Sequence, residues 1–242
     1  MPTFYNGRRT SKLLSLRVKS IRDPFRDQKA LLKDTSVRTV LDVGAHKGDL
    51  TAIYLKTFPR ATIYSFEPSP ESFERLQIRF KGNLSVKPVQ LAISSEGGQS
   101  TFFVNRNSAT NSLLPKTVDA DKWADTSGDM TNLNRITVET TTIDKFCQEN
   151  QLDAIQILKL DLQGAELKAL QGARRSLRRK AISLVFLETN FVPIYEGQCT
   201  FTEIVEYLSE YDYRLFNLYN LATAENGQLK WCDVLFRPED FS

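Results

Sequence analysis

The chain has 242 residues, which is enough for one large domain or two small ones. Hydrophobic residues make up 41% of it and charged residues 25%, a balance typical of globular proteins rather than disordered ones. Its three cysteines lie far apart and His46 is its one histidine, which argues against a disulfide framework, a structural zinc site and a histidine-rich metal cluster. No apolar run is long enough to span a membrane, and the basic N-terminus lacks the apolar core of a signal peptide, so we expect a cytoplasmic protein.

The net charge of +3 is unevenly distributed, because residues 1–33 carry +7 and residues 34–242 carry −4. Either the basic segment contacts phosphate groups or an anionic membrane surface, or it is the solvated face of a helix that packs on the rest of the chain. We predict a basic arm or helix over residues 1–35, followed by a single domain over 36–242.

Strand-like and helix-like segments alternate in the first third of this domain. Three short apolar runs predict strands over 37–43, 62–66 and 86–93. Apolar residues at helical spacing predict a helix over 49–58. A second helix follows Ser69, which is placed to cap it, with Pro70 in the first turn.

The alternation is interrupted over about 97–140, which we predict to be an insertion in the domain. Residues 99–104 and 136–142 each have the composition of an additional strand. The polar residues between 105 and 134 show no clear period. A connection of this length often forms a lid or binds substrate.

The alternation resumes after the insertion. Strands are predicted over 154–160, 181–187, 214–219 and 230–236, with helices over 143–150 and 164–177 and a turn near 226–227. Thr200 and Glu203 form a capping box that starts one more helix. The regular alternation predicts an α/β fold with a mostly parallel sheet, and the last two strands, which are close in sequence, predict an antiparallel edge.

Ligands bind beyond the carboxyl ends of the strands in open α/β sheets. The first strand is followed by the segment Asp42-Val43-Gly44-Ala45-His46-Lys47-Gly48. Its glycines are spaced GxxxG, whereas the turn that holds a dinucleotide pyrophosphate requires GxGxxG. The acidic opening at Asp42 suits a smaller adenosine ligand that carries an ammonium and a sulfonium.

Glu67 ends the second strand, 25 residues after Asp42. A carboxylate at this position can accept hydrogen bonds from both hydroxyls of a ribose. NAD and S-adenosylmethionine share that ribose, so the glycine spacing, rather than Glu67, separates the two cofactors. The alternative is that Asp42 and Glu67 are surface carboxylates that happen to end strands.

The chain resembles the FkbM-type S-adenosylmethionine-dependent methyltransferases over roughly residues 37–236. The segments that carry this resemblance are VLDVGAHKGDLT (40–51), YSFEPSPESFERL (64–76), ILKLDLQGAELKALQGA (157–173) and FTEIVEYLSEYDYRLFNLYN (201–220). It implies a class I methyltransferase, Rossmann-like fold with a seven-stranded sheet and O-methylation of a sugar or polyketide hydroxyl. The sequence departs from the family pattern at His46, where Asn is more frequent, and at Gln163, where Glu is frequent.

The resemblance also implies which residues bind S-adenosylmethionine. The residues expected at its methionine end are Asp42, Gly44, Ala45, His46 and Gly48. Glu67 is expected to hold the ribose, with Pro68 and Ser69 beside it, and Ala92 and Ile93 are expected to flank the adenine. His46 is a hydrogen-bond donor to the cofactor, a catalytic base, or a loop histidine that only caps.

The reaction needs an aligned acceptor and the exclusion of water, because the methyl group on a sulfonium is already activated. A hydroxyl acceptor is also helped by a general base. Asp161 is the first candidate for this base and Glu188 is the second, since they end neighbouring strands. Together they share the acceptor or hold a divalent cation such as Mg²⁺, although two carboxylates do not define a metal site. Asp161 has a structural alternative, which is to cap the helix after Gly164.

The sequence therefore predicts an S-adenosylmethionine-dependent O-methyltransferase that acts on a sugar, a glycan or another small, polyketide-like molecule. In this interpretation no specific nucleic acid is bound, and the basic arm makes at most a peripheral membrane contact. The alternative is a catalytically silent Rossmann-like module that binds nucleic acid or a membrane surface through the arm, which steep salt dependence would reveal. An NAD-dependent oxidoreductase is disfavoured by the absence of GxGxxG.

Overall fold

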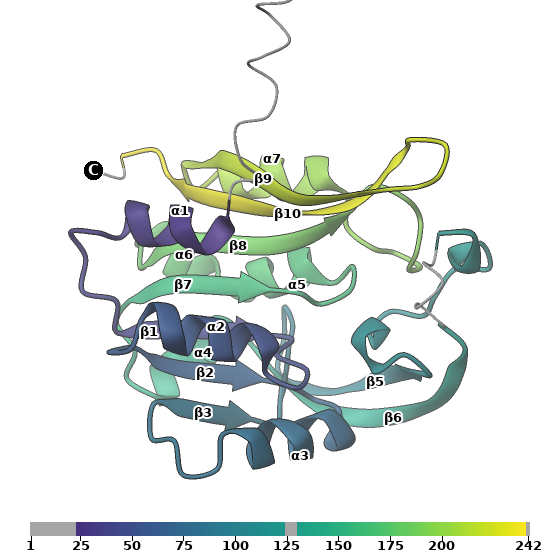
Figure 1. Ribbon diagram of the computed structural model, residues 1–242, viewed down its shortest axis with the longest axis horizontal. Coiled ribbons are helices and arrows are strands. Elements are labelled where there is room, and N and C mark those ends of the chain that lie inside the picture. Colours follow the sequence, from purple (N-terminus) through teal and green to yellow (C-terminus); the bar gives the residue numbers. More distant parts are fainter. Residues whose placement is uncertain (1–22, 124–129, 241–242) are drawn as a thin grey trace, which may run out of the picture.

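The computed structural model describes residues 23–123 and 130–240, which form a large sheet with helices on both faces and a smaller sheet beside it (Figure 1). The predicted arm over 1–35 therefore lies largely outside the described residues. Within residues 23–123 and 130–240, no helix combines the length and the apolar composition that crossing a membrane requires.

The large sheet has seven strands in the order β3-β2-β1-β7-β8-β10-β9. Neighbouring strands are parallel except that β10 runs antiparallel to both β8 and β9. The expected mostly parallel sheet with an antiparallel edge hairpin is confirmed. The strands are β1 (Thr39–Val43), β2 (Thr62–Phe66), β3 (Val86–Val89), β7 (Ile155–Leu160), β8 (Ile182–Asn190), β9 (Tyr213–Thr223) and β10 (Leu229–Pro238).

The two central strands, β1 and β7, are buried at every position because helices cover both faces of the sheet. One face packs against α1 (Pro24–Leu31) and α2 (Asp49–Thr57), where Tyr54 and Phe58 belong to the core. The opposite face packs against four helices, which are α4 (Ile143–Glu149), α5 (Glu166–Gln171), α6 (Arg174–Arg178) and α7 (Phe201–Ser209). A further helix, α3 (Pro70–Arg79), contacts β3.

The smaller sheet has the order β4-β6-β5 and consists of β4 (Ala92–Ile93), β5 (Gly98–Asn105) and β6 (Asn132–Thr141). The prediction of one strand over 86–93 was wrong, because β3 ends at Val89 and β4 joins the smaller sheet instead. Pro88 lacks an N–H to donate to a further neighbour, as suits the edge strand β3. Residues predicted as an insertion also include two 3₁₀ helices, η2 (Ser108–Thr110) and η3 (Ala120–Lys122).

One predicted helix is divided, and one predicted side-chain cap is not formed. The helix expected over 164–177 is divided into α5 and α6, with Gly172 between them; a Cβ on Gly172 would lie 2.3 Å from the Ser94 carbonyl oxygen. Ser69 occupies the N-cap position of α3, but its side chain makes no capping hydrogen bond. The capping box of Thr200 and Glu203 at the start of α7 is confirmed.

Candidate active site

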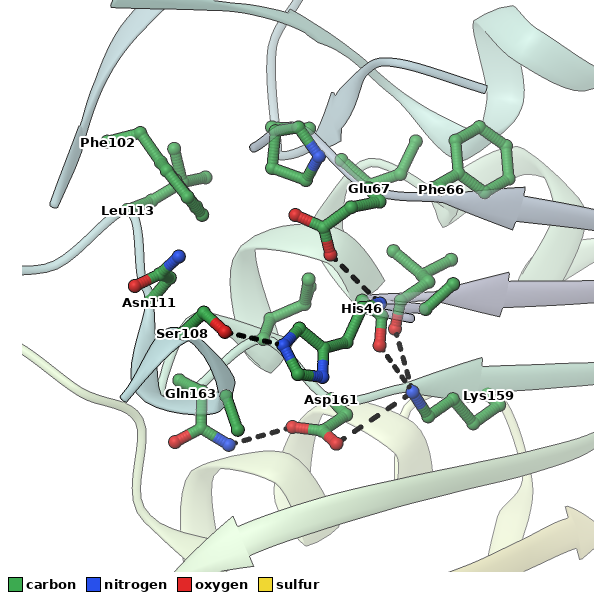
Figure 2. Close-up of a pocket in the computed structure, with 18 of the residues that line it drawn as sticks. His46, Phe66, Glu67, Phe102, Ser108, Asn111, Leu113, Lys159, Asp161 and Gln163 are labelled. Atoms are coloured by element: carbon green, nitrogen blue, oxygen red, sulfur yellow. Dashed lines mark hydrogen bonds and ion pairs between the residues drawn. The ribbon is translucent and has the colours of Figure 1, made fainter. Parts of the chain in front are cut away.

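A pocket lies at the carboxyl ends of β1, β2 and β7, where the large sheet faces the smaller one (Figure 2). It contains about 910 Å³ of empty space, part of it open to solvent. Glu67, His46 and Asp161 come from the strand ends, and Phe102, Leu113, Asn111 and Ser108 face them from the opposite wall. The pocket therefore occupies the position where open α/β sheets bind their ligands.

The turn after β1 brings the backbone close to the end of β7. Gly44 has a positive φ of 78°, and a Cβ there would lie 1.9 Å from the Asp161 carbonyl oxygen, so no other residue can replace this glycine without movement. Ala45 and His46 follow it along the pocket wall. Gly48 does not line the pocket; a Cβ there would meet Phe80 and Leu76, so this glycine allows α2 to pack.

Glu67 is held by the backbone at both of its carboxylate oxygens. The His46 N–H donates to Oε2 and the Ser69 N–H donates to Oε1, each over 2.9 Å. Ser69 thus supports Glu67 and does not line the pocket, whereas Pro68 does. Burial raises the pKa of Glu67 to about 7, against these hydrogen bonds, which lower it. Each oxygen keeps a lone pair with which to accept a further donor.

Asp42 does not line the pocket, because its side chain is fully buried beneath it. Its Oδ1 lies 3.1 Å from Lys159 Nζ on the neighbouring strand, and its Oδ2 accepts the Thr51 hydroxyl over 2.6 Å. Burial by itself lowers the pKa of Lys159, but the charges of Asp42 and Asp161 outweigh it and raise that pKa above its ordinary value. Asp42 therefore acts on the pocket indirectly, by holding Lys159, which does line it.

Lys159 was missed by the sequence reasoning, although it lies inside a quoted motif. Its Nζ donates to the Gly44 carbonyl oxygen over 2.8 Å and lies 3.8 Å from Asp161 Oδ2 (Figure 2). The available signal was a lysine within a buried central strand in which Gln156 is the other polar residue. A buried ammonium in that position requires a carboxylate partner.

Asp161 and Glu188 are joined by Gln163. The Gln163 amide nitrogen donates to Asp161 Oδ1 over 2.8 Å and to Glu188 Oε1 over 3.0 Å. Asp161 lines the pocket with its side chain 34% exposed, whereas Glu188 lies behind the wall. Burial, then the charges of Asp161 and Asp233, raise the pKa of Glu188 well above its usual range. The helix-capping role considered for Asp161 is not observed, because Ala165 is the N-cap of α5 and no side chain caps this helix. Glu166 Oε1 instead accepts from the Leu162 and Gly164 N–H groups of the turn that precedes α5.

The expectation that Asp161 and Glu188 hold Mg²⁺ between them is not supported. The two N–H bonds of the Gln163 amide point at these carboxylates, and N–H donors repel a cation. Within the described ranges, no group of three or more His, Cys, Asp or Glu side chains is arranged to hold a metal ion.

The wall opposite the strand ends is formed by β4 with the residue before it, by β5, and by the segment that follows β5. Ala92 and Ile93 lie at its apolar end beside Phe102 and Leu91. At its polar end, Ser108 Oγ lies 2.8 Å from His46 Nε2. The pKa of His46 is lowered, chiefly by burial and then by Lys47, which favours the neutral imidazole.

Asn111 is a second residue that the sequence did not single out. Its Oδ1 accepts the Asn105 N–H over 2.8 Å, while its Nδ2 is buried and has no hydrogen-bond partner among the described residues. It lines the pocket, so this amide nitrogen is available to a ligand. In the sequence it was only one of the polar residues between 105 and 134, which show no clear period.

The seven-stranded sheet, its antiparallel edge and the pocket at the strand ends are those of a class I S-adenosylmethionine-dependent methyltransferase. A family model described as the methyltransferase FkbM domain matches residues 42–215, and the chain belongs to this family. The resemblance noted in the sequence is thereby confirmed.

Two curated proteins are similar to this chain in sequence. The 2-O-methyltransferase NoeI of Sinorhizobium fredii is 25% identical over 186 residues, which cover 72% of each protein. The hexuronic acid methyltransferase AglP of Haloferax volcanii is 24% identical over 174 residues, which cover 71% of this chain and 64% of AglP. Among solved structures, the METTL16 MTase domain has a TM-score of 0.51 at 9% identity, covering 89% of this chain and 66% of that one, a likeness in fold alone.

Proposed function

We propose that the protein transfers the methyl group of S-adenosylmethionine to a hydroxyl group of a sugar, either free or within a glycan. The observation that carries this proposal is the partly exposed Asp161 carboxylate, which shares one pocket with Glu67 and the glycine turn. The names of the two relatives, a 2-O-methyltransferase and a hexuronic acid methyltransferase, support a sugar acceptor.

The described residues fit S-adenosylmethionine from one end of the pocket to the other. Glu67 has two oriented oxygens for the ribose hydroxyls, with Pro68 beside it. The apolar surface near Ala92, Ile93 and Phe102 suits the adenine. The turn residues Gly44, Ala45 and His46 suit the methionine part. Three of the expected residues support the pocket without lining it. Asp42 holds Lys159, Gly48 allows α2 to pack, and Ser69 orients Glu67.

Asp161 is the best of the three candidate bases. Lys159 Nζ and Gln163 Nε2 both present donors to its carboxylate, as an anion requires, and it is exposed to the pocket. Glu188 is set behind the wall, and its raised pKa favours the protonated form. His46 is neutral, but its Nε2 is engaged with Ser108. When bound, the cofactor supplies an activated methyl group, so the protein has to orient the acceptor hydroxyl, exclude water and take up its proton.

The first test measures S-adenosylhomocysteine formation with a panel of simple sugars and methyl glycosides. We expect methylation of at least one sugar, and a loss of about 10²–10⁴-fold in turnover for Asp161→Asn, the usual contribution of a general base. Asp153→Asn changes an exposed aspartate at the other end of β7 and is the matched control.

Calorimetry with S-adenosylhomocysteine separates the alternatives. A folded protein that does not bind this ligand contradicts the proposal. Binding without methylation of any sugar contradicts the sugar acceptor. Full activity in Asp161→Asn contradicts the assignment of the base.

A further inference from the structure

Gln163 links the two carboxyl groups at the ends of β7 and β8, because both Asp161 and Glu188 accept from its side-chain amide. An amide nitrogen carries two hydrogens and can donate twice. Here Gln163 Nε2 lies 2.8 Å from Asp161 Oδ1 and 3.0 Å from Glu188 Oε1. Asp161 follows β7, and Glu188 is near the end of β8. These adjacent strands therefore present their carboxylates to a single donor group (Figure 2 shows Gln163 and Asp161).

The surroundings determine which way the amide points. Turning it over would place its carbonyl oxygen against the Asp161 carboxylate, which is repulsive, and would remove the N–H donor from that carboxylate. In the observed orientation, Gln163 Oε1 accepts from the Tyr195 hydroxyl over 2.7 Å, and that hydroxyl also lies 3.1 Å from the Thr110 carbonyl oxygen. Tyr195 is buried, and burial raises its pKa, so it stays protonated and able to donate.

The backbone of Gln163 is also held in an unusual conformation. Its φ is 53°, in the left-handed region that non-glycine residues seldom adopt. The Ser112 hydroxyl donates to the Gln163 carbonyl oxygen over 2.9 Å. The segment after β5 thus holds Gln163 in two ways. Ser112 binds its main chain directly, and Thr110 contacts the Tyr195 hydroxyl that binds its side chain. Such local strain persists where the surrounding contacts over-determine it, and it clusters at functional sites.

We propose that Gln163 is a positioning residue, which ties Asp161 and Glu188 into one hydrogen-bonded unit and fixes the Asp161 carboxylate for the acceptor hydroxyl. This inference rests on the proposed function, in which Asp161 takes the proton. Gln163 itself does not exchange a proton with the acceptor. It keeps Asp161 Oδ1 occupied, so that Oδ2 is the oxygen left for the acceptor.

The charged groups around this unit make its protonation sensitive to Gln163. Lys159 approaches Asp161 from β7, and Glu67 and His46 face it across the pocket. Glu188 meets the charges of Asp233 on β10 and Glu166 on α5. Carboxylates outnumber cations here, and their mutual repulsion disfavours the charged forms. The Gln163 amide opposes this effect, because it donates to both Asp161 and Glu188 and a donor favours the charged form of a carboxylate. A carboxylate in place of the amide would disfavour those forms.

The test compares the affinities of S-adenosylmethionine and S-adenosylhomocysteine by calorimetry from about pH 5.5 to 8.5. The two ligands share the ribose and adenine, so contributions from Glu67 cancel in the ratio. They differ by one methyl group and one positive charge at sulfur. Burial raises the pKa of Glu188 well above its usual range, so the preference for the charged ligand should rise with pH as Glu188 ionises, and then level off.

Three variants change the unit in different ways. In Gln163→Glu, a third carboxylate should move the midpoint of this rise upward by about one pH unit or more. In Gln163→Met, loss of both N–H donors should move it upward as well. Tyr195→Phe keeps the amide and removes the contact that orients it, and should cause a smaller shift in the same direction.

Gln156→Met is the matched control. Gln156 is buried at the opposite end of β7, where its Oε1 accepts from the Arg38 and Thr39 N–H groups. It should lower thermal stability and leave the midpoint unchanged. The inference would be overturned if Gln163→Glu and Gln163→Met both kept the midpoint of the wild type. If Gln163→Met does not fold, the midpoints of the nearly isosteric Gln163→Glu and of Tyr195→Phe decide the test. If the Gln163 variants shift the midpoint but the wild type methylates no sugar, the proposed acceptor is contradicted and the role of Gln163 in joining the two carboxylates is supported.

Discussion

Individual carboxylates in this pocket behave according to what surrounds them. Glu67, Asp42 and Asp161 all end strands, yet the first is held by two backbone N–H groups, the second is buried against Lys159, and the third is exposed to the pocket. Burial raises the pKa of Glu67, whereas contact with cationic or N–H groups favours the ionised form of a carboxylate. In the proposed function, the same functional group thus serves ligand binding, structural support and proton transfer at three positions.

Glu67 leads to a pH-dependence prediction for cofactor binding. Its pKa is raised to about 7 in the free protein, and ribose hydroxyls donate best to the ionised carboxylate. Protonation as the pH falls below 7 should therefore weaken binding of S-adenosylhomocysteine, up to tenfold per pH unit, whereas affinity should be constant well above 7.

Calorimetry across this range measures the effect, with Glu67→Gln as the matched variant. The variant should bind more weakly at high pH, by about 1.5–3 kcal/mol for a hydrogen bond to a charged group, and should show a flatter pH dependence. An equally steep dependence in Glu67→Gln would assign the titration to another group.

At the scale of elements, β1 and β7 are joined by more than their backbone ladder. Asp42 and Lys159 are directly opposite in the register of these parallel strands, and their side chains form a buried ion pair. Lys159 also donates to Gly44 at the start of the turn. The pair therefore connects the two central strands to the turn that shapes the pocket.

Removing one member of this pair should be costly. Lys159→Met leaves the Asp42 carboxylate buried without a cationic partner, with the Thr51 hydroxyl still donating to it, and breaking a buried pair in this way costs about 3–5 kcal/mol. Urea unfolding at neutral pH measures the loss.

The double variant Asp42→Asn/Lys159→Met is the control, because it removes both charges. It should be less destabilised than the sum of the two single variants. A loss below about 1 kcal/mol in Lys159→Met, the size typical of an exposed ion pair, would contradict the structural role assigned to the pair.

On the scale of the whole molecule, the pocket exists because the smaller sheet lies beyond the carboxyl ends of the strands of the large sheet (Figure 1). The large sheet supplies Glu67 and Asp161, and the smaller sheet with its following loop supplies Phe102 and Asn111 (Figure 1, Figure 2). Among the described residues that line the pocket, Lys159 is the single lysine or arginine, and it is paired with Asp42. The end of the pocket near Asp161 is therefore acidic, since Asp161 lines it and Glu188 shares the Gln163 amide with Asp161.

This charge distribution predicts a preference for uncharged acceptors. Two like charges about 6 Å apart repel by roughly 3 kcal/mol at an effective dielectric constant of about 20. The bound sulfonium offsets part of this repulsion, so we expect a neutral hexoside to be methylated at least about tenfold more efficiently, in kcat/KM, than the corresponding hexuronoside.

The methyl ester of the hexuronoside is the matched control, because it keeps the shape of the acid and removes its charge. Its efficiency should approach that of the neutral sugar. A hexuronoside methylated as efficiently as its ester would contradict the prediction and would indicate a cationic group that compensates the acceptor carboxylate.

The sequence by itself determined the secondary structure and most of the sheet. Apolar runs identified β1, β2 and β7, and the positions of Glu67 and Asp161 at strand ends placed them at one edge. These features are local, because burial of a central strand requires apolar residues in succession and a parallel sheet aligns its carboxyl ends. The capping box at Thr200 was readable for the same reason.

Only the tertiary structure decided which polar groups meet. Lys159 contacts Gly44 across 115 positions of sequence, and Gln163 reaches Glu188 across 25. It also decided that β4 leaves the large sheet and that Asn111 faces the pocket. Periodicity reports whether a side chain is buried, but not against what, since its partner depends on how distant elements pack. Asp42 illustrates the difference: the sequence marked its strand end, and packing turned its carboxylate toward Lys159, away from the pocket.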